Sequence, residues 1–284
     1  MRQLDGRVQG GYRTARRGSG LDLAGLRPYA DGDDARHIDW NVTARLDEPQ
    51  LREFTEDREL TSWLVLDRSA SMGVGGPGRG KQDVLTELAL VLARLLGRGG
   101  NRVGAVLYGT GEARIVPPGT GRRQALRIAH ELARPGAVPS GSPGATTDLA
   151  AMLGTVAGLA RRSLVVVVSD LIGTGDWERP LMRLAHRNEV VALRVVDPVD
   201  DALPEVGLVV VEDAETGEQV LVDSGDPWFR ARFRDGVDAR EAELGAGMRR
   251  AGVPLHRVDT GSDLVATLVR VVSATRRPGG GAAR

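Results

Sequence analysis

The sequence contains no cysteine, which excludes disulfide bonds and thiolate metal sites and favours a reducing compartment. Its 38 basic and 38 acidic side chains cancel, so no overall field attracts nucleic acid or an anionic membrane. The longest apolar run, Leu164 to Val168, is far too short to span a bilayer, and residues 1–20 have no apolar core of a signal peptide. These absences predict a soluble, cytoplasmic protein without membrane insertion or a nucleic-acid partner.

Hydrophobic residues make up 41% of the 284 residues but aromatic residues only 4%, which predicts a core of Val, Leu and Ala. From residue 60 onward, short apolar runs alternate with segments of helical periodicity. This alternation predicts an α/β fold with a doubly wound, mostly parallel sheet. The expected strands are 60–66, 103–108, 113–116 (antiparallel, at an edge), 163–168, 189–196 and 255–258; the expected helices are 82–96, 124–133, 148–160, 177–187, 228–251 and 262–275.

The chain is expected to consist of an N-terminal appendage (1–58), an α/β domain (59–275) and a disordered tail (276–284). Turn residues and scattered aromatics without a helical period predict that the appendage is mostly extended or irregular. A β-hairpin insertion is expected near 207–222 within the α/β domain. We also expect Trp40 and Trp63 to be core anchors between the appendage and the sheet.

Polar oxygens follow two of the predicted strands at the points where those strands end. Asp67, Ser69 and Ser71 follow a strand as Asp-x-Ser-x-Ser, and Asp170 ends the strand that begins at Ser163. Thr147 is expected to be the N-cap of the next helix. Open α/β sheets bind ligands at the carboxyl edge, and parallel neighbouring strands lie roughly 5 Å apart, so these groups can converge on one ion.

Carboxylate and hydroxyl oxygens suit Mg²⁺, and none of these groups is a good general base, so the pattern predicts metal-dependent binding instead of catalysis. Mg²⁺ keeps positions open for water or a partner's oxygen, so the ligand would be an Asp or Glu of another protein. The alternative interpretation of Asp-x-Ser-x-Ser is a turn held by local hydrogen bonds, which Asp and Ser favour.

With Thr147 and Asp170, the Asp-x-Ser-x-Ser pattern resembles the metal-ion-dependent adhesion site of von Willebrand factor type A domains. Over residues 20–270 the chain also resembles a bacterial family, domain-of-unknown-function family 58. The matching segments include Arg27-Pro28-Tyr29, Ile38-Asp39-Trp40-Asn41, Arg102-Val103-Gly104, Ser169-Asp170-Leu171 and Asp197-Pro198.

This resemblance implies a von Willebrand A-like fold and a non-enzymatic protein-interaction module. It implies Mg²⁺, Mn²⁺ or Ca²⁺ on Asp67, Ser69, Ser71, Thr147 (with Thr146 as the alternative) and Asp170. Members of the family often occur beside MoxR-type AAA+ ATPases, which implies such an ATPase, or its client, as the partner.

Two other functions compete with this interpretation. Gly75 to Lys81 fits the phosphate-loop pattern Gly-x-x-x-x-Gly-Lys, which would make the chain a nucleotide-binding enzyme. Gln82 replaces the usual Ser or Thr, and Pro77 removes one backbone donor, so a flexible loop with Lys81 near a helix start is the preferred interpretation. The second competitor is a metal-independent scaffold whose interface is the appendage.

Overall fold

A computed structural model gives the fold. It describes residues 17–30, 32–55, 60–75, 78–109, 113–134, 148–173, 175–202, 204–212 and 218–275. The chain divides into two compact units, Met1–Glu59 and Leu60–Arg284. Within the described residues, none of the helices combines the length and the apolar character needed to cross a bilayer. The expected tail, 276–284, lies outside the described residues.

The first unit is built on one antiparallel pair, β1 (Arg17–Pro28) and β2 (Gln50–Thr55), joined through η1 (Ala35–His37) and α2 (Trp40–Leu46). Asp39 caps α2 by accepting from the backbone N–H groups of Asn41 and Val42. The expectation that Trp40 is a core anchor is wrong, because its side chain is 68% exposed. It occupies the first position of a seven-residue helix that buries none of its residues.

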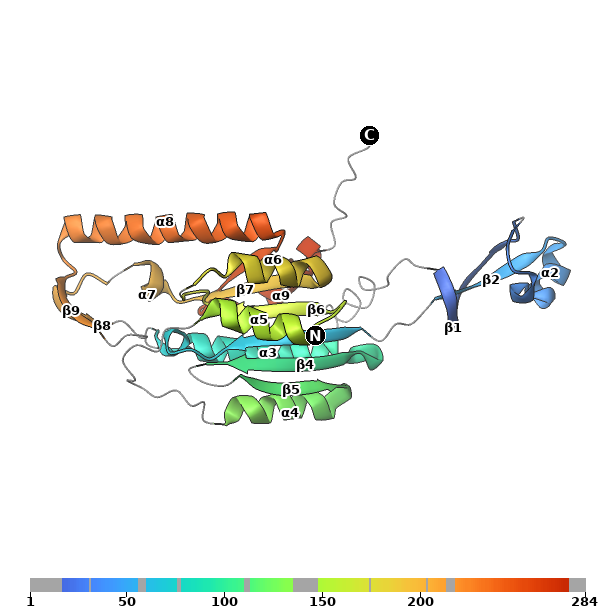
Figure 1. Ribbon diagram of the computed structural model, residues 1–284, viewed down its shortest axis with the longest axis horizontal. Helices are drawn as coiled ribbons and strands as arrows, with labels where there is room; N and C mark the ends of the chain where they lie inside the picture. Colours follow the sequence, from blue (N-terminus) through green and yellow to red (C-terminus); the bar gives the residue numbers. More distant parts are fainter. Residues whose placement is uncertain are drawn as a thin grey trace, which may run out of the picture. The chain divides into compact units, whose positions relative to one another are not determined.

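The second unit is organised around a six-stranded sheet with the order β10-β7-β6-β3-β4-β5 (Figure 1). All neighbouring strands are parallel except β5, which runs antiparallel to β4 at the edge. The predicted fold class, a doubly wound and mostly parallel α/β sheet, is therefore confirmed. The bounds are β3 (Thr61–Asp67), β4 (Arg102–Tyr108), β5 (Arg114–Gly119), β6 (Leu164–Ser169), β7 (Glu189–Val196) and β10 (Leu255–Asp259).

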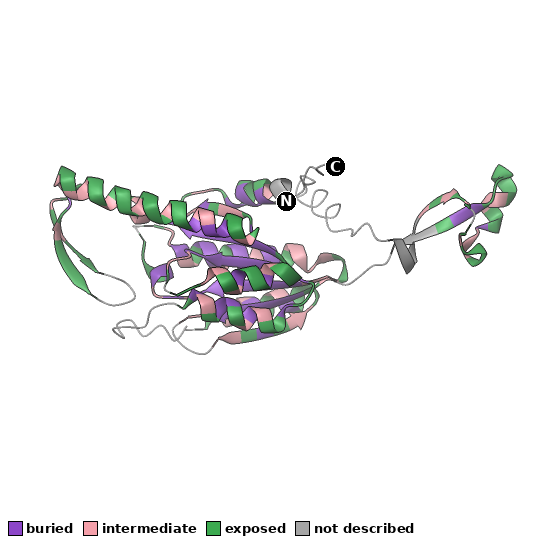
Figure 2. Ribbon diagram, turned by 45° about the horizontal axis from the view of Figure 1, so that its top comes forward, coloured by how far each residue is buried: buried purple, intermediate pink, exposed green. Residues whose placement is uncertain are grey.

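Helices cover both faces of this sheet, and the inner strands β7, β6, β3 and β4 are largely buried between them (Figure 2). On one face, α5, α6 and α8 pack on Trp63, Val65 and Val167, whereas α3 packs on the other. Trp63, in contrast to Trp40, is buried. The bounds are α3 (Lys81–Leu96), α4 (Gly121–Ala133), α5 (Leu149–Leu159), α6 (Glu178–Arg187), α7 (Pro198–Asp201), α8 (Pro227–Ala251) and α9 (Leu264–Thr275), with 3-10 turns η2 (Ser71–Gly73) and η3 (Arg98–Gly100).

Each expected helix start differs from the observed one by one to three residues, and the starts of α5 and α4 have identifiable local causes. The cap of α5 is Asp148, not Thr147, because the Asp148 carboxylate accepts from the backbone N–H of Ala151. Helix α4 begins at Gly121, three residues before the expected start at Gln124. Gly121 has a positive φ of 68°, a conformation that glycine adopts without steric cost.

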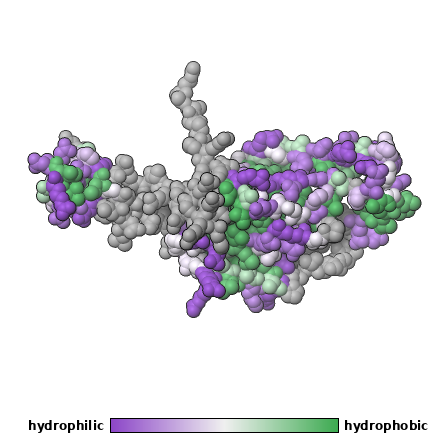
Figure 3. Space-filling model, turned by 180° about the vertical axis from the view of Figure 1, so that it is seen from behind, coloured by the Kyte–Doolittle hydropathy of each residue, from purple (hydrophilic) through white to green (hydrophobic). Residues whose placement is uncertain are grey.

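A separate antiparallel pair, β8 (Leu208–Glu212) and β9 (Gln219–Asp223), precedes α8. Leu208, Val210 and Leu221 of this pair are each at least 60% exposed. Figure 3 shows the resulting apolar surface at the end of the second unit where β8 and β9 lie.

Candidate metal centre

Asp67 ends β3 beside the end of β6, because β3 and β6 are parallel neighbours with Leu66 opposite Val168. Its carboxylate is fully buried. Oδ2 accepts from the hydroxyl of Ser169 at 2.6 Å, and Oδ1 accepts from the backbone N–H of Ser69 at 2.9 Å. Ser169, at the end of β6, therefore helps to fix the orientation of the Asp67 carboxylate at the end of β3.

The two serines that follow Asp67 bring their hydroxyl groups together. The Oγ atoms of Ser69 and Ser71 lie 2.9 Å apart, and both side chains are buried. The turn η2 begins at Ser71. The bond from the Ser69 N–H to Asp67 is the local turn that the alternative interpretation expects, but a turn alone does not require two further hydroxyls to be buried beside the carboxylate.

Asp170 follows β6 and places a second buried carboxylate at this edge of the sheet. Its Oδ1 accepts from the N–H of Ile172 at 3.1 Å, and its backbone oxygen accepts from Arg194 Nε at 3.0 Å. The next residue, Leu171, has a φ of 56°, in the left-handed region that bulky residues rarely adopt. The strained backbone here lies directly beside the candidate site, where such strain is commonly found.

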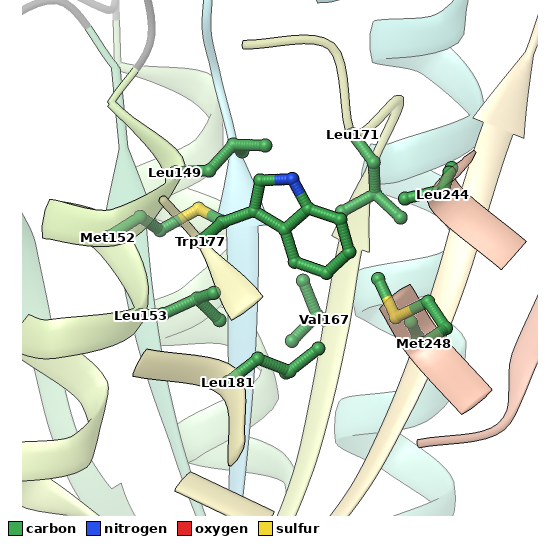
Figure 4. A pocket seen from close by; sticks show the side chains of 10 residues that line it. Leu149, Met152, Leu153, Val167, Leu171, Trp177, Leu181, Leu244 and Met248 are labelled. Atoms are coloured by element: carbon green, nitrogen blue, oxygen red, sulfur yellow. The ribbon is translucent and has the colours of Figure 1, made fainter. Parts of the chain in front are cut away.

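The Leu171 side chain anchors this loop in the core. It lines an apolar pocket together with Trp177 and Met248, between β6, α6 and α8 (Figure 4). The Leu171 N–H donates to Ser169 Oγ at 2.8 Å, so the same hydroxyl that binds Asp67 also holds the turn after Asp170. Packing and hydrogen bonding together determine where Asp170 lies.

Thr147, and Thr146 as its alternative, lie outside the described residues, so this ligand stays a prediction. In the described ranges, no three His, Cys, Asp or Glu side chains come together in a way that could hold a metal ion. A metal at this edge would therefore need hydroxyl oxygens in addition to Asp67 and Asp170. Ser69 and Ser71 supply two of these.

Comparison with known proteins identifies the family. The sequence model of the family described as "Protein of unknown function DUF58" matches residues 25–243. The chain belongs to this family. Proteins of Mycobacterium bovis and Mycobacterium tuberculosis, both described as uncharacterised, are each 37% identical to it over 276 residues, which cover 97% of this chain and 86% of theirs.

Two solved structures resemble this DUF58 chain at low sequence identity. One is the conserved hypothetical protein BatB from Bacteroides thetaiotaomicron, with a TM-score of 0.48, 15% identity and coverage of 76% of this chain and 98% of that one. The other is the VWA domain of SpRpn10, with a TM-score of 0.39, 14% identity and coverage of 75% and 95%. At these scores neither structure bears on the function of this DUF58 protein.

The electrostatics of the site favour a bound cation. Burial, and then the negative charge of Asp170, raise the pKa of Asp67 to about 6, although the Ser169 hydrogen bond acts in the opposite direction. A cation placed beside Asp67 would offset the burial and the neighbouring negative charge that disfavour the ionisation of this carboxylate. The hard oxygen donors of the described set fit Mg²⁺.

Besides Asp200, sequence reasoning missed Lys81 at this site. It is the first residue of α3, 1% exposed, and its Nζ donates to Asp170 Oδ2 at 3.1 Å and to Asp200 Oδ2 of α7, also at 3.1 Å. One signal was present: the other 37 of the 38 basic residues are arginines, so Lys81 is the only lysine in the chain.

This position of Lys81 argues against a phosphate-binding loop. Its ammonium is turned inward onto two carboxylates, whereas a phosphate loop needs it directed at the phosphates.

Proposed function

We propose that this DUF58 chain is a non-enzymatic interaction module that binds an acidic side chain of a partner protein through a divalent metal. The observation that supports this most directly is the pair of buried carboxylates, Asp67 and Asp170, beside the paired hydroxyls of Ser69 and Ser71. Buried carboxylates require a compensating charge or hydrogen bonds, and here the acids outnumber the single lysine. The absence of cysteine fits a cytoplasmic location.

Asp67, Ser69, Ser71, Asp170 and Thr147 (or Thr146) would hold the ion, some of them through water. Within the described part of the chain, Oδ1 of Asp67 accepts from the Ser69 N–H and Oδ2 from the Ser169 hydroxyl, and a carboxylate oxygen can accept more than one such bond, from a metal-bound water included. We propose Mg²⁺, with Mn²⁺ and Ca²⁺ as other oxygen-binding candidates. When bound, the metal would supply an open coordination position for the partner's Asp or Glu.

The partner we propose is a MoxR-type AAA+ ATPase or a client of such an ATPase, and this rests on the family resemblance alone. The test is a pull-down from native lysate with the purified chain as bait, in Mg²⁺ and in EDTA. We expect an AAA+ ATPase to be retained only with Mg²⁺. Retention in both conditions would favour the metal-independent scaffold.

Asp67→Ala should lower Mn²⁺ affinity by about 100-fold or more, because it removes the buried carboxylate that ends β3 beside the end of β6. The measurement is isothermal titration of the purified chain with Mn²⁺, with a thermal melt to establish that the variant is folded. Asp67→Asn, which keeps the size and an acceptor for Ser169, separates the loss of charge from the loss of packing.

Asp235→Asn is the matched control, because Asp235 is an exposed aspartate of α8. Its Mn²⁺ affinity should equal that of the unmodified chain. Unchanged Mn²⁺ binding by a folded Asp67→Ala variant would overturn the proposed site.

A further inference from the structure

Lys81 is an unusual residue to find in this position. A buried ammonium is costly unless it is paired, and here three carboxylate oxygens lie within 3.3 Å of Nζ: Asp170 Oδ2 and both oxygens of Asp200. An ammonium has three N–H donors on a compact head, which suits three oxygens arranged around one point. A planar guanidinium presents a different geometry, and a chain with 37 arginines has its one lysine here.

Asp170 is the carboxylate that both Lys81 and the metal would contact. Its Oδ1 accepts from the Ile172 N–H and its Oδ2 accepts from Lys81, so a fixed cation already lies against the oxygen that faces α3. A second cation bound to the same carboxylate would be repelled by the ammonium, because both lie in a buried site where charges are poorly screened.

We propose that Lys81 is a positioning residue that acts as a built-in competitor of the metal: its ammonium holds Asp170 in place and lowers the affinity of the site for a divalent cation. This inference rests on the proposed function, because it concerns the same site. The weakened affinity leaves metal binding dependent on the additional oxygen that an acidic partner supplies.

Asp200 sets how strongly Lys81 competes. It shares the ammonium with Asp170 and also accepts from the Asp197 N–H at 2.9 Å, which fixes it at the start of α7. Asp197 in turn accepts from Thr260 Oγ1, just after β10, at 3.0 Å. If the Asp200 carboxylate is removed, Asp170 is the carboxylate partner that Lys81 keeps among the described residues, and the attraction of Asp200 for a cation is also lost.

Removing the charge of Lys81 and removing the charge of Asp200 should therefore change the Mn²⁺ affinity in opposite directions. Lys81→Met should raise Mn²⁺ affinity by about tenfold or more, and Asp200→Asn should lower it by a few-fold or more, given the strength of charge interactions in buried sites. The measurement is Mn²⁺ titration of the full chain by calorimetry, with Mg²⁺ as a competing ion. Lys81→Arg, which retains the charge, should bring the affinity back toward that of the unmodified chain.

Thermal melts in EDTA and in saturating Mn²⁺ give a second readout. A ligand that binds only the folded state stabilises it by RT ln(1 + [L]/Kd), so at one Mn²⁺ concentration the shift in melting temperature should be larger in Lys81→Met than in the unmodified chain. Lys81→Gln, which is neutral but keeps a donor for Asp170, replaces Lys81→Met if the latter does not fold.

The outcomes separate this inference from the proposed function. If the unmodified chain binds Mn²⁺ and the neutral variants bind it equally or more weakly, the competitor role is overturned and the metal site stands. If neither the unmodified chain nor the neutral variants bind Mn²⁺, the proposed function itself is overturned. Binding that is detectable only in the neutral variants supports both.

Discussion

At the scale of single residues, the scarce aromatics impose strict requirements on their neighbours. Trp63 lies in β3 opposite Gly104 of β4, and its indole covers the position where a side chain at 104 would lie. A Cβ on Gly104 would come within 2.8 Å of the Trp63 ring and 3.1 Å of Pro118 in β5. The missing side chain at 104 therefore makes room for a buried tryptophan.

Gly104→Ala should destabilise the chain by about 1–3 kcal/mol, because the added methyl group overpacks a buried site that cannot readily give way. The measurement is the midpoint of urea unfolding. Gly154→Ala is the control: Gly154 is an exposed residue within α5 with open space around it, and alanine there should be stabilising by about 0.5–1 kcal/mol. Equal midpoints for the two variants would contradict the packing argument.

At the scale of elements, the pair β8 and β9 exposes apolar side chains that other strands of this chain bury. Leu208 and Leu221 are 72% and 65% exposed, whereas every residue of β6 is buried. An isolated pair of strands buries too little surface to be stable by itself, so β8 and β9 depend on the rest of the unit to which they are attached. Their apolar side chains contribute little to that unit's core.

The double variant Leu208→Lys, Leu221→Lys should therefore change the free energy of unfolding by no more than about 0.5 kcal/mol per site. Leu64→Ala in β3, where the leucine is fully buried, should cost about 2–5 kcal/mol and is the comparison. Thermal melts of the unmodified chain, the double lysine variant and Leu64→Ala measure the two losses of stability. A large loss of stability in the double lysine variant would mean that these leucines belong to the core.

Patterns local in sequence predicted the elements well, and interactions between distant residues account for what was missed. The all-buried run of β6 and the ends of β3 and β6 follow from apolar runs that stop at Asp67 and Ser169. The pairing of Lys81 with Asp170 spans 89 positions and depends on how α3 docks, which no local pattern encodes. The expectation that Trp40 is a core anchor failed for the same reason, because the burial of an aromatic side chain depends on which residues pack over it.

At the scale of the whole molecule, the two units differ in how much core each contains. In the first unit only Asp39, Gln50 and Leu51 are buried among the residues whose burial is described. The second unit contains the six-stranded sheet and the helices on both of its faces. Its first residue, Leu60, is held by two backbone hydrogen bonds: its N–H donates to Asn101 Oδ1, and its carbonyl accepts from the Arg102 N–H.

A chain that begins at Leu60 should consequently fold and melt within a few degrees of the full chain, because the sheet and its covering helices all lie within it. The isolated segment 1–59 should show no cooperative melt, since the three buried residues among those whose burial is described cannot offset the entropy of ordering. Scanning calorimetry of the two fragments and the full chain measures this. A cooperative transition in 1–59 alone would contradict it.

The burial of the only lysine also determines which modifications the folded chain can accept. With Lys81 enclosed at the start of α3, the folded chain presents no lysine amine to solvent. Enzymes that acetylate lysines, or that attach protein tags to them through isopeptide bonds, would find an acceptor side chain only after the packing around α3 has opened. Acetylation or protein tagging of Lys81 would therefore report that the chain has unfolded. Amine-reactive cross-linkers would not capture partners of the folded chain through lysine side chains.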